Sequence, residues 1–288
     1  MKSAHRVSAG RFAAWAAMGL ALALSACALR VPMESSADGT SVAEAPDDDE
    51  TPAPDTAPDT PPDHALQASA WALATQVDGT PPAWVHQRFG KRRPTRYAPQ
   101  AHEGRPAVHA LSEAGNSTLR LPLAPVRDVS AMRLAFSWFV PALNEAADLR
   151  DDDIDDAVVR VVLTFDGDRS RLSTRDHLLS ELSQLITGLP LPYATLMYVW
   201  DNRYPVGTVI PNPHTQRIRQ LVIESGPDGL NRWRDHERDI EADFRAAFGE
   251  APGRLTALGV MTDANNTGQT VNAWYGPVSL RPALAAQR

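Results

Sequence analysis

Residues 132–140 read MRLAFSWFV, and this stretch decides the fold class. Its apolar residues alternate along one face, which is the period of a half-buried strand. Residues 158–165 read VVRVVLTF and are rich in the β-branched side chains that strands favour. Similar runs lie at 107–111, 117–123, 193–200, 217–225, 254–261 and 271–280. About eight strands are therefore expected, separated by clusters of Pro, Gly, Asp and Asn.

Two segments between these runs have helical periodicity instead. Leucines recur at helical spacing across 174–187, and Gly188 follows as a helix-ending residue. The second segment, 230–248, has an apolar face, and Gly249 and Pro252 come after it. Two helices among eight strands are too few for a parallel α/β sheet. The pattern therefore predicts a mainly β fold, a β-sandwich with two inserted helices.

Residues 1–27 are typical of a bacterial secretion signal. Three basic residues precede an uncharged apolar run of 15 residues, which is too short to span a bilayer comfortably. The run ends in Leu24-Ser25-Ala26-Cys27, which resembles a lipobox. We expect Cys27 to be acylated and to anchor the mature protein to a membrane. An ordinary signal peptide or an uncleaved anchor is the alternative. Since Ala28 rather than Asp follows, sorting to the outer membrane of the cell envelope is expected, facing the periplasm or the cell surface.

Residues 28–65 are expected to be a disordered acidic tether. They contain ten acidic residues, one basic residue, seven prolines and no aromatic residue. Such a stretch buries too little apolar surface to offset its chain entropy. A calcium-binding or partner-binding role for the acidic run is the alternative. The remaining residues, 66–288, are expected to form a single β-sandwich domain.

Charge and cysteine content exclude several classes of protein. The chain has a formal net charge of −7, but the tether alone carries −9, so residues 66–288 carry only −1. A protein without a basic field is not expected to bind nucleic acid. The single cysteine excludes an intramolecular disulfide and any cysteine-cluster metal site. The sequence also lacks a G-x-S-x-G elbow, H-E-x-x-H, a P-loop and G-x-G-x-x-G.

A first polar group follows the strand at 158–165. Asp166 and Asp168 lie on either side of Gly167. Asp-Gly sequences support tight turns, so turn formation is one interpretation. The other is ligation of Ca²⁺, because carboxylates two residues apart can converge on one hard cation.

A second group joins the end of the strand at 193–200 to the loop after it. Trp200, Asp201, Asn202 and Arg203 combine a flat apolar ring with planar polar groups, the mixture that sugar sites need. The alternative is a core tryptophan followed by a turn that hydrogen-bonds to itself. His214 lies in a loop stiffened by two prolines, Pro211 and Pro213, and is either structural or catalytic.

A third group follows the strand at 254–261. Asp263 and Asn265 come directly after it, and Trp274 lies in the last strand. These side chains either satisfy the backbone of their own loop or bind hydroxyl groups or a cation. We weigh the two interpretations equally.

These segments resemble the bacterial domain-of-unknown-function 3047 family. The matching stretches are FDGDRSRL (165–172), residues 189–226, FGEAPGRL (248–255) and MTDANNTGQTVNAWYGPVSL (261–280). The last of them is also similar to jelly-roll carbohydrate-binding modules and galactose-binding-like domains. That resemblance implies an antiparallel jelly-roll β-sandwich, a structural Ca²⁺ and a glycan ligand.

Three functions follow from these expectations. The favoured one is a non-catalytic domain on a lipid anchor that binds a carbohydrate or envelope glycan. Trp200 or Trp274 would stack on the sugar, and the polar groups at 201–203, 263 and 265 would bind its hydroxyls. The alternative is a hydrolase or lyase acting on an envelope polymer, with Asp166, Asp201 and Asp263 as candidate acid/base groups assisted by His214. The third is a structural envelope protein.

Overall fold

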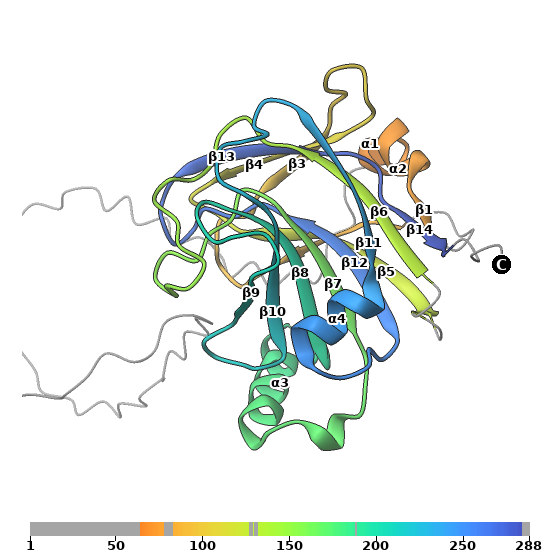
Figure 1. The fold of residues 1–288 in the computed structure, drawn as a ribbon, viewed down its shortest axis with the longest axis vertical. Helices are drawn as coiled ribbons and strands as arrows, with labels where there is room; N and C mark the ends of the chain where they lie inside the picture. Colours follow the sequence, from red (N-terminus) through yellow and green to blue (C-terminus); the bar gives the residue numbers. More distant parts are fainter. Residues whose placement is uncertain (1–63, 78–82, 127–128, 130–131, 188, 284–288) are drawn as a thin grey trace, which may run out of the picture.

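The computed structural model describes residues 64–77, 83–126, 129, 132–187 and 189–283. Their strands form two sheets of seven. Sheet I contains β1 (Gln76–Val77), β3 (Arg96–Pro99), β4 (Val108–Glu113), β6 (Met132–Phe139), β11 (Trp233–Asp239), β13 (Thr270–Tyr275) and β14 (Ser279–Pro282). Sheet II contains β2 (Val85–Arg88), β5 (Ser117–Val126), β7 (Arg160–Phe165), β8 (Ala194–Asp201), β9 (Val209–Pro211), β10 (Ile218–Ser225) and β12 (Leu255–Met261). In Figure 1 strands β3, β4 and β13 arch over the strands of sheet II.

The connectivity is that of a jelly-roll sandwich. The chain crosses between the sheets from β4 to β5, from β5 to β6 and from β6 to β7. It crosses again from β11 to β12 and from β12 to β13. The strands pair antiparallel except for β8 with β10 and β1 with β14, which are parallel. The predicted mainly β sandwich is therefore confirmed, with fourteen strands in the described residues instead of about eight. The extra strands are mostly short pieces at sheet edges.

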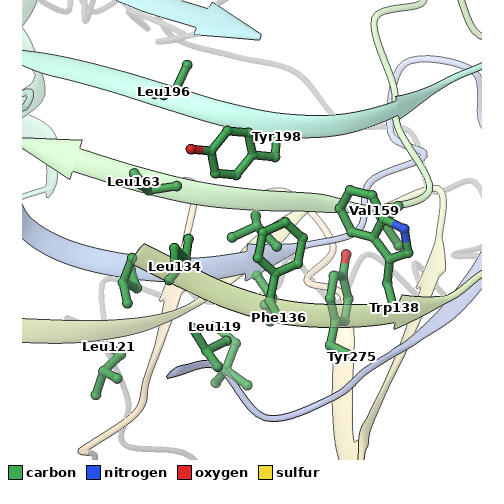
Figure 2. Packing of buried hydrophobic residues seen from close by; sticks show 14 of the residues in the cluster. Leu119, Leu121, Leu134, Phe136, Trp138, Val159, Leu163, Leu196, Tyr198 and Tyr275 are labelled. Carbon is green, nitrogen blue, oxygen red and sulfur yellow. The ribbon is translucent and has the colours of Figure 1, made fainter. Parts of the chain in front are cut away.

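One apolar core fills the space between the sheets. Sheet I contributes Phe136 and Trp138 from β6, and sheet II contributes Leu163 and Tyr198. Figure 2 shows these side chains meeting between the two layers. The alternating residues of the stretch at 132–140 thus form the centre of the core, as their period predicts. The other face of each sheet is called its outer face below.

The helices differ in part from the expectation. Helix α3 (Thr174–Thr187) lies where it was predicted. The predicted helix at 230–248 is wrong in its first half, because residues 233–239 form β11 and only α4 (Ile240–Phe248) is helical. Gly249 ends α4 with a positive φ of 71°. The short helices α1 (His64–Gln67) and α2 (Ala70–Ala74), and a 3₁₀ turn at Arg169–Arg171, were not predicted.

A long connection between β6 and β7, residues 140–159, covers part of the outer face of sheet II. We call it the β6–β7 segment. Leu149 and Ala157 from this segment pack on Val199, Ile210 and Val222 of β8, β9 and β10. Among the described residues, no helix is both long and apolar enough to cross a membrane.

Candidate functional site

The polar residues that follow β8 bind the β6–β7 segment. The Asn202 side chain donates hydrogen bonds to the carbonyls of Asn144 (2.6 Å) and Ala147 (2.9 Å). Arg203 forms an ion pair with Asp148 at 3.1 Å. These two candidate ligand-binding residues therefore use their polar groups to fix a segment of their own chain.

Trp200 and Asp201 are in the interior. Trp200 is 2% exposed, and its indole N–H donates to the carbonyl of Gly226 (2.9 Å). Asp201 is 3% exposed and accepts a hydrogen bond from the backbone N–H of Arg203 (2.7 Å), as in a self-bonded turn. The enclosed cavity beside them has a volume of about 10 Å³, which is close to that of a single water. A sugar ring has no access to Trp200 in this arrangement.

Asp263 is also buried, in an ion pair with Arg160. Its carboxylate accepts a hydrogen bond from the backbone N–H of Ala157 (3.0 Å), which again fixes the β6–β7 segment. Burial raises the pKa of Asp263 to about 7, although the nearby Arg160 acts to lower it. The Asp263 carboxyl group is thus the partner of the buried Arg160 guanidinium.

His214 and Asn265 lie at the rim of the same segment. The Nε2 atom of His214 is 3.7 Å from the carboxylate of Asp152. Asn265 contacts Asn266, whose side chain donates to Asp155 (2.7 Å). The structure therefore brings most of the candidate residues to one end of sheet II, where they surround the β6–β7 segment and hold it in place.

Three candidates lie elsewhere. Asp166 is at the opposite end of β7, where it pairs with Arg254 (2.7 Å), and this hydrogen bond lowers the pKa of the carboxyl group. Asp168 accepts a hydrogen bond from the Ser170 backbone N–H (3.0 Å) and caps the 3₁₀ turn. Within the described residues, no three His, Cys, Asp or Glu side chains are grouped to hold a metal ion. Trp274 stacks on the rings of His102 and His109.

The outer face of sheet I contains an open groove of about 410 Å³. Its floor is made of small residues on β6 and β14, including Ala135, Ser137 and Ser279. The strand registers place Ala135 between Glu237 of β11 and Ser279 of β14, so all three point away from the core. Small side chains on two adjacent strands, β6 and β14, leave the hollow.

Charged groups stand on both sides of this floor. Asp235 and Glu237 of β11 form one wall, and Arg281 of β14 stands on the other side of β6. Asp235 is paired with Arg105 at 2.7 Å. The guanidinium of Arg281 donates to the Ser279 hydroxyl (2.7 Å). The groove thus offers carboxylate, guanidinium and hydroxyl groups on rigid strands.

An aromatic cluster adjoins the groove on the same outer face. Trp233 precedes Asp235 by two residues on β11, and Phe139 follows Ser137 by two residues on β6. The two rings meet edge to face with centroids 5.9 Å apart. Trp274 also meets Phe139, at 5.8 Å. Apolar ring surface and polar side chains therefore lie side by side.

Basic residues on the inner face of β11 fix the strand to the sandwich. Arg234 pairs with Glu224 of β10 (2.7 Å), and Arg238 donates to Asp243 (2.8 Å). His236 lies beside Glu224, at 3.5 Å, and burial lowers the pKa of His236 to about 4. These contacts on the inner face of β11 thus hold in place the strand whose outer face forms the groove wall.

The groove could not be predicted while residues 233–239 were assigned to a helix, because they form its wall strand β11. A signal was available, because residues 233–239 read WRDHERD and basic and acidic residues alternate at every position from 234 to 239. A period of two places the acidic residues on one face of a strand and the basic ones on the other. Helical spacing mixes the two charges.

Residues 82–279 match the family model described as "Protein of unknown function (DUF3047)". No curated protein matches the sequence.

Two solved structures illustrate more distant likenesses. One is a family 11 carbohydrate-binding module of the cellulosomal cellulase Lic26A-Cel5E of Clostridium thermocellum, with 9% identity, a TM-score of 0.38, and coverage of 75% of this chain and 96% of that one. The other is endo-1,4-β-glucanase CelB2, with 13% identity, a TM-score of 0.38, and coverage of 72% and 95%. Because both TM-scores are below 0.5, the fold assignment rests on the sheet order and the core described above.

Proposed function

The chain belongs to the DUF3047 family, and from this premise we propose that it is a lipid-anchored envelope protein that binds a carbohydrate or envelope glycan. The proposed binding site is the groove on the outer face of sheet I. The candidate residues around the β6–β7 segment hold that segment on sheet II and do not form the site.

The groove itself is the observation that supports this proposal. Its volume of about 410 Å³ lies within the range of small-molecule sites. Sugars have an apolar C–H face and many hydroxyl groups. The groove offers both kinds of contact. Ala74, Ala135 and Pro277 supply apolar surface, and Asp235 and Ser137 supply a carboxylate and a hydroxyl group.

Binding is favoured over cleavage by the position of the carboxylates. Glycoside cleavage usually uses two carboxyl groups that flank the scissile bond. Asp235 and Glu237 stand two residues apart on one strand and therefore on one wall of the groove. The earlier acid/base candidates Asp201 and Asp263 are buried, and Asp166 lies at the other end of sheet II.

The experiment is to fill the groove without touching the core. Ala135→Leu places a larger side chain on the groove floor, where Ala135 is partly exposed. We expect this variant to weaken binding of soluble envelope and cell-wall oligosaccharides on the order of tenfold or more in calorimetry. The matched control is Ala98→Leu, on the outer face of edge strand β3, which should bind as the unaltered chain does. Equal binding by both variants, or no binding of any oligosaccharide by the unaltered chain, rejects the proposal.

The lipid anchor is the second part of the proposal. It is supported by the lipobox-like stretch at 24–27, by the apolar run before it and by the chain's single cysteine at its end. Cys27 lies outside the described residues. An anchored domain on an acidic tether would present the groove to polymers of the envelope.

A further inference from the structure

Glu237 differs from the other acidic residues on the outer face of β11. Asp235 pairs with Arg105 at 2.7 Å, and Asp239 pairs with Arg133 at 3.0 Å. Glu237 lies between them, is exposed, and makes no ion pair or hydrogen bond with any described residue. It also stands directly beside the groove floor, in register with Ala135.

The remaining cation of the groove does not neutralise Glu237. Arg281 lies on β14, beyond β6, and its register partner on β6 is Arg133 rather than Ala135. The two charged residues are therefore separated by two strand spacings, about 10 Å, and by a further two residues, about 7 Å, along the strands. The guanidinium of Arg281 is directed instead to the Ser279 hydroxyl.

We propose that Glu237 binds an ammonium group of the ligand, so that the groove prefers a glycan with free amino groups over its N-acetylated or neutral counterpart. This inference rests on the proposed carbohydrate binding in the same groove. An ammonium group can donate charge-assisted hydrogen bonds to a free carboxylate, which are stronger than neutral ones. N-acetylation removes the positive charge and with it this contact.

The size of the preference follows from the exposure of Glu237. In water, two opposite unit charges about 4 Å apart gain an amount of free energy equivalent to roughly a fivefold change in affinity. A groove shields the pair only partly from solvent, so a preference on the order of fivefold to tenfold is expected. It should shrink as the salt concentration rises, because exposed charges are screened.

The experiment compares two oligosaccharides of equal length. The full chain is titrated with glucosamine oligomers and with N-acetylglucosamine oligomers by calorimetry, at a pH where the free amine is protonated. The unaltered chain should bind the amine form about fivefold more tightly or better. Glu237→Gln should remove this difference, because it weakens binding of the amine form to about the affinity of the N-acetyl form. The matched control, Glu113→Gln, removes a carboxylate of the same outer face outside the groove and should keep the preference.

The possible outcomes separate this inference from the proposed function. Equal affinity for the two oligomers, or a preference that persists in Glu237→Gln or that is insensitive to salt, overturns the role of Glu237 and leaves carbohydrate binding intact. A short lysine peptide that binds as tightly as the amine oligomer also overturns it, because the ligand would then be a peptide. Failure of the unaltered chain to bind any sugar rejects the proposed function itself.

Discussion

Arg160 and Asp263 form a buried ion pair on the outer face of sheet II, beneath the β6–β7 segment, where each side chain is 5% exposed. Arg160 also donates to the side chain of Gln220 (3.3 Å) and to the backbone carbonyl of Asp155. Asp263 in turn accepts from the Ala157 backbone. This pair connects β7, the loop after β12 and the β6–β7 segment, so its removal should affect stability before it affects any ligand.

The expected cost can be stated. Asp263→Asn keeps the shape of the side chain but leaves the guanidinium of Arg160 buried without its partner charge. Removing one member of a buried pair typically costs about 3–5 kcal/mol. We expect the free energy of unfolding in urea to fall by that order. Asp166→Asn is the control, because Asp166 pairs with Arg254 at the surface, where the two side chains are 38% and 52% exposed respectively. Such exposed pairs contribute about 0–1 kcal/mol. Similar losses in the two variants would contradict the structural role of Asp263.

Trp200 shows what the sequence could have revealed about single residues. Leu196, Tyr198 and Trp200 are two apart on β8 and all belong to the core between the sheets, while Val199 faces outward. The period of two therefore already assigned Trp200 to the interior. The partners of Asn202 and Arg203 were not predictable, because they come from the β6–β7 segment, which has no regular period.

At the scale of elements, the hydrophobic pattern predicted where a regular element lies better than whether that element is a helix or a strand. The apolar alternation at 132–140 determined β6 correctly because its buried face is all apolar. Strand β11 was mistaken for a helix because its inner face is basic and pairs with Glu224 and Asp243, so hydrophobicity carries no signal there. The stretches at 107–111 and 117–123 both form strands, as predicted, but β4 and β5 lie in opposite sheets although they are consecutive in the chain.

Helix α3 exposes two of its leucines and buries two of its polar residues, the reverse of what its sequence pattern suggests. Leu178 is 64% exposed and Leu185 is 82% exposed, whereas Asp176 and Ser180 are buried. Asp176 accepts from the Ser173 hydroxyl (2.7 Å) and from Thr215, and Ser180 accepts from Arg169 (2.6 Å). Polar contacts therefore attach this helix to the domain.

This arrangement predicts the effect of substitutions in α3. Leu178→Gln and Leu185→Gln should change the free energy of unfolding by no more than about 0.5 kcal/mol, as at other exposed positions. Asp176→Ala should cost roughly 1–3 kcal/mol, because the Thr215 hydroxyl then loses its acceptor. Urea unfolding of the three variants decides the matter. If the leucine variants were the more damaging ones, the helix would have to pack through its apolar side, as the leucine spacing alone suggests.

Across the whole molecule, the paired charges and the net acidity lie in different parts of the chain. Residues 66–288 are nearly neutral, and their paired charges mostly fix strands and segments to each other. The net acidity lies in residues 28–65. Thirty-six residues separate Cys27 from the first described helix, enough to reach at most about 120 Å when fully extended. Membrane attachment and folding of the domain should therefore be independent.

That independence gives a test of the anchor. Cys27→Ser removes the only thiol that could be acylated, so we expect the chain to move from the membrane fraction to the soluble fraction after cell lysis. The midpoint of thermal unfolding should not change, because the substitution lies far along the chain from every described contact. Ser36→Ala, in the tether, is the matched control and should remain with the membrane. If Cys27→Ser also stays there, the anchor is an uncleaved apolar segment or another attachment, and acylation of Cys27 is rejected.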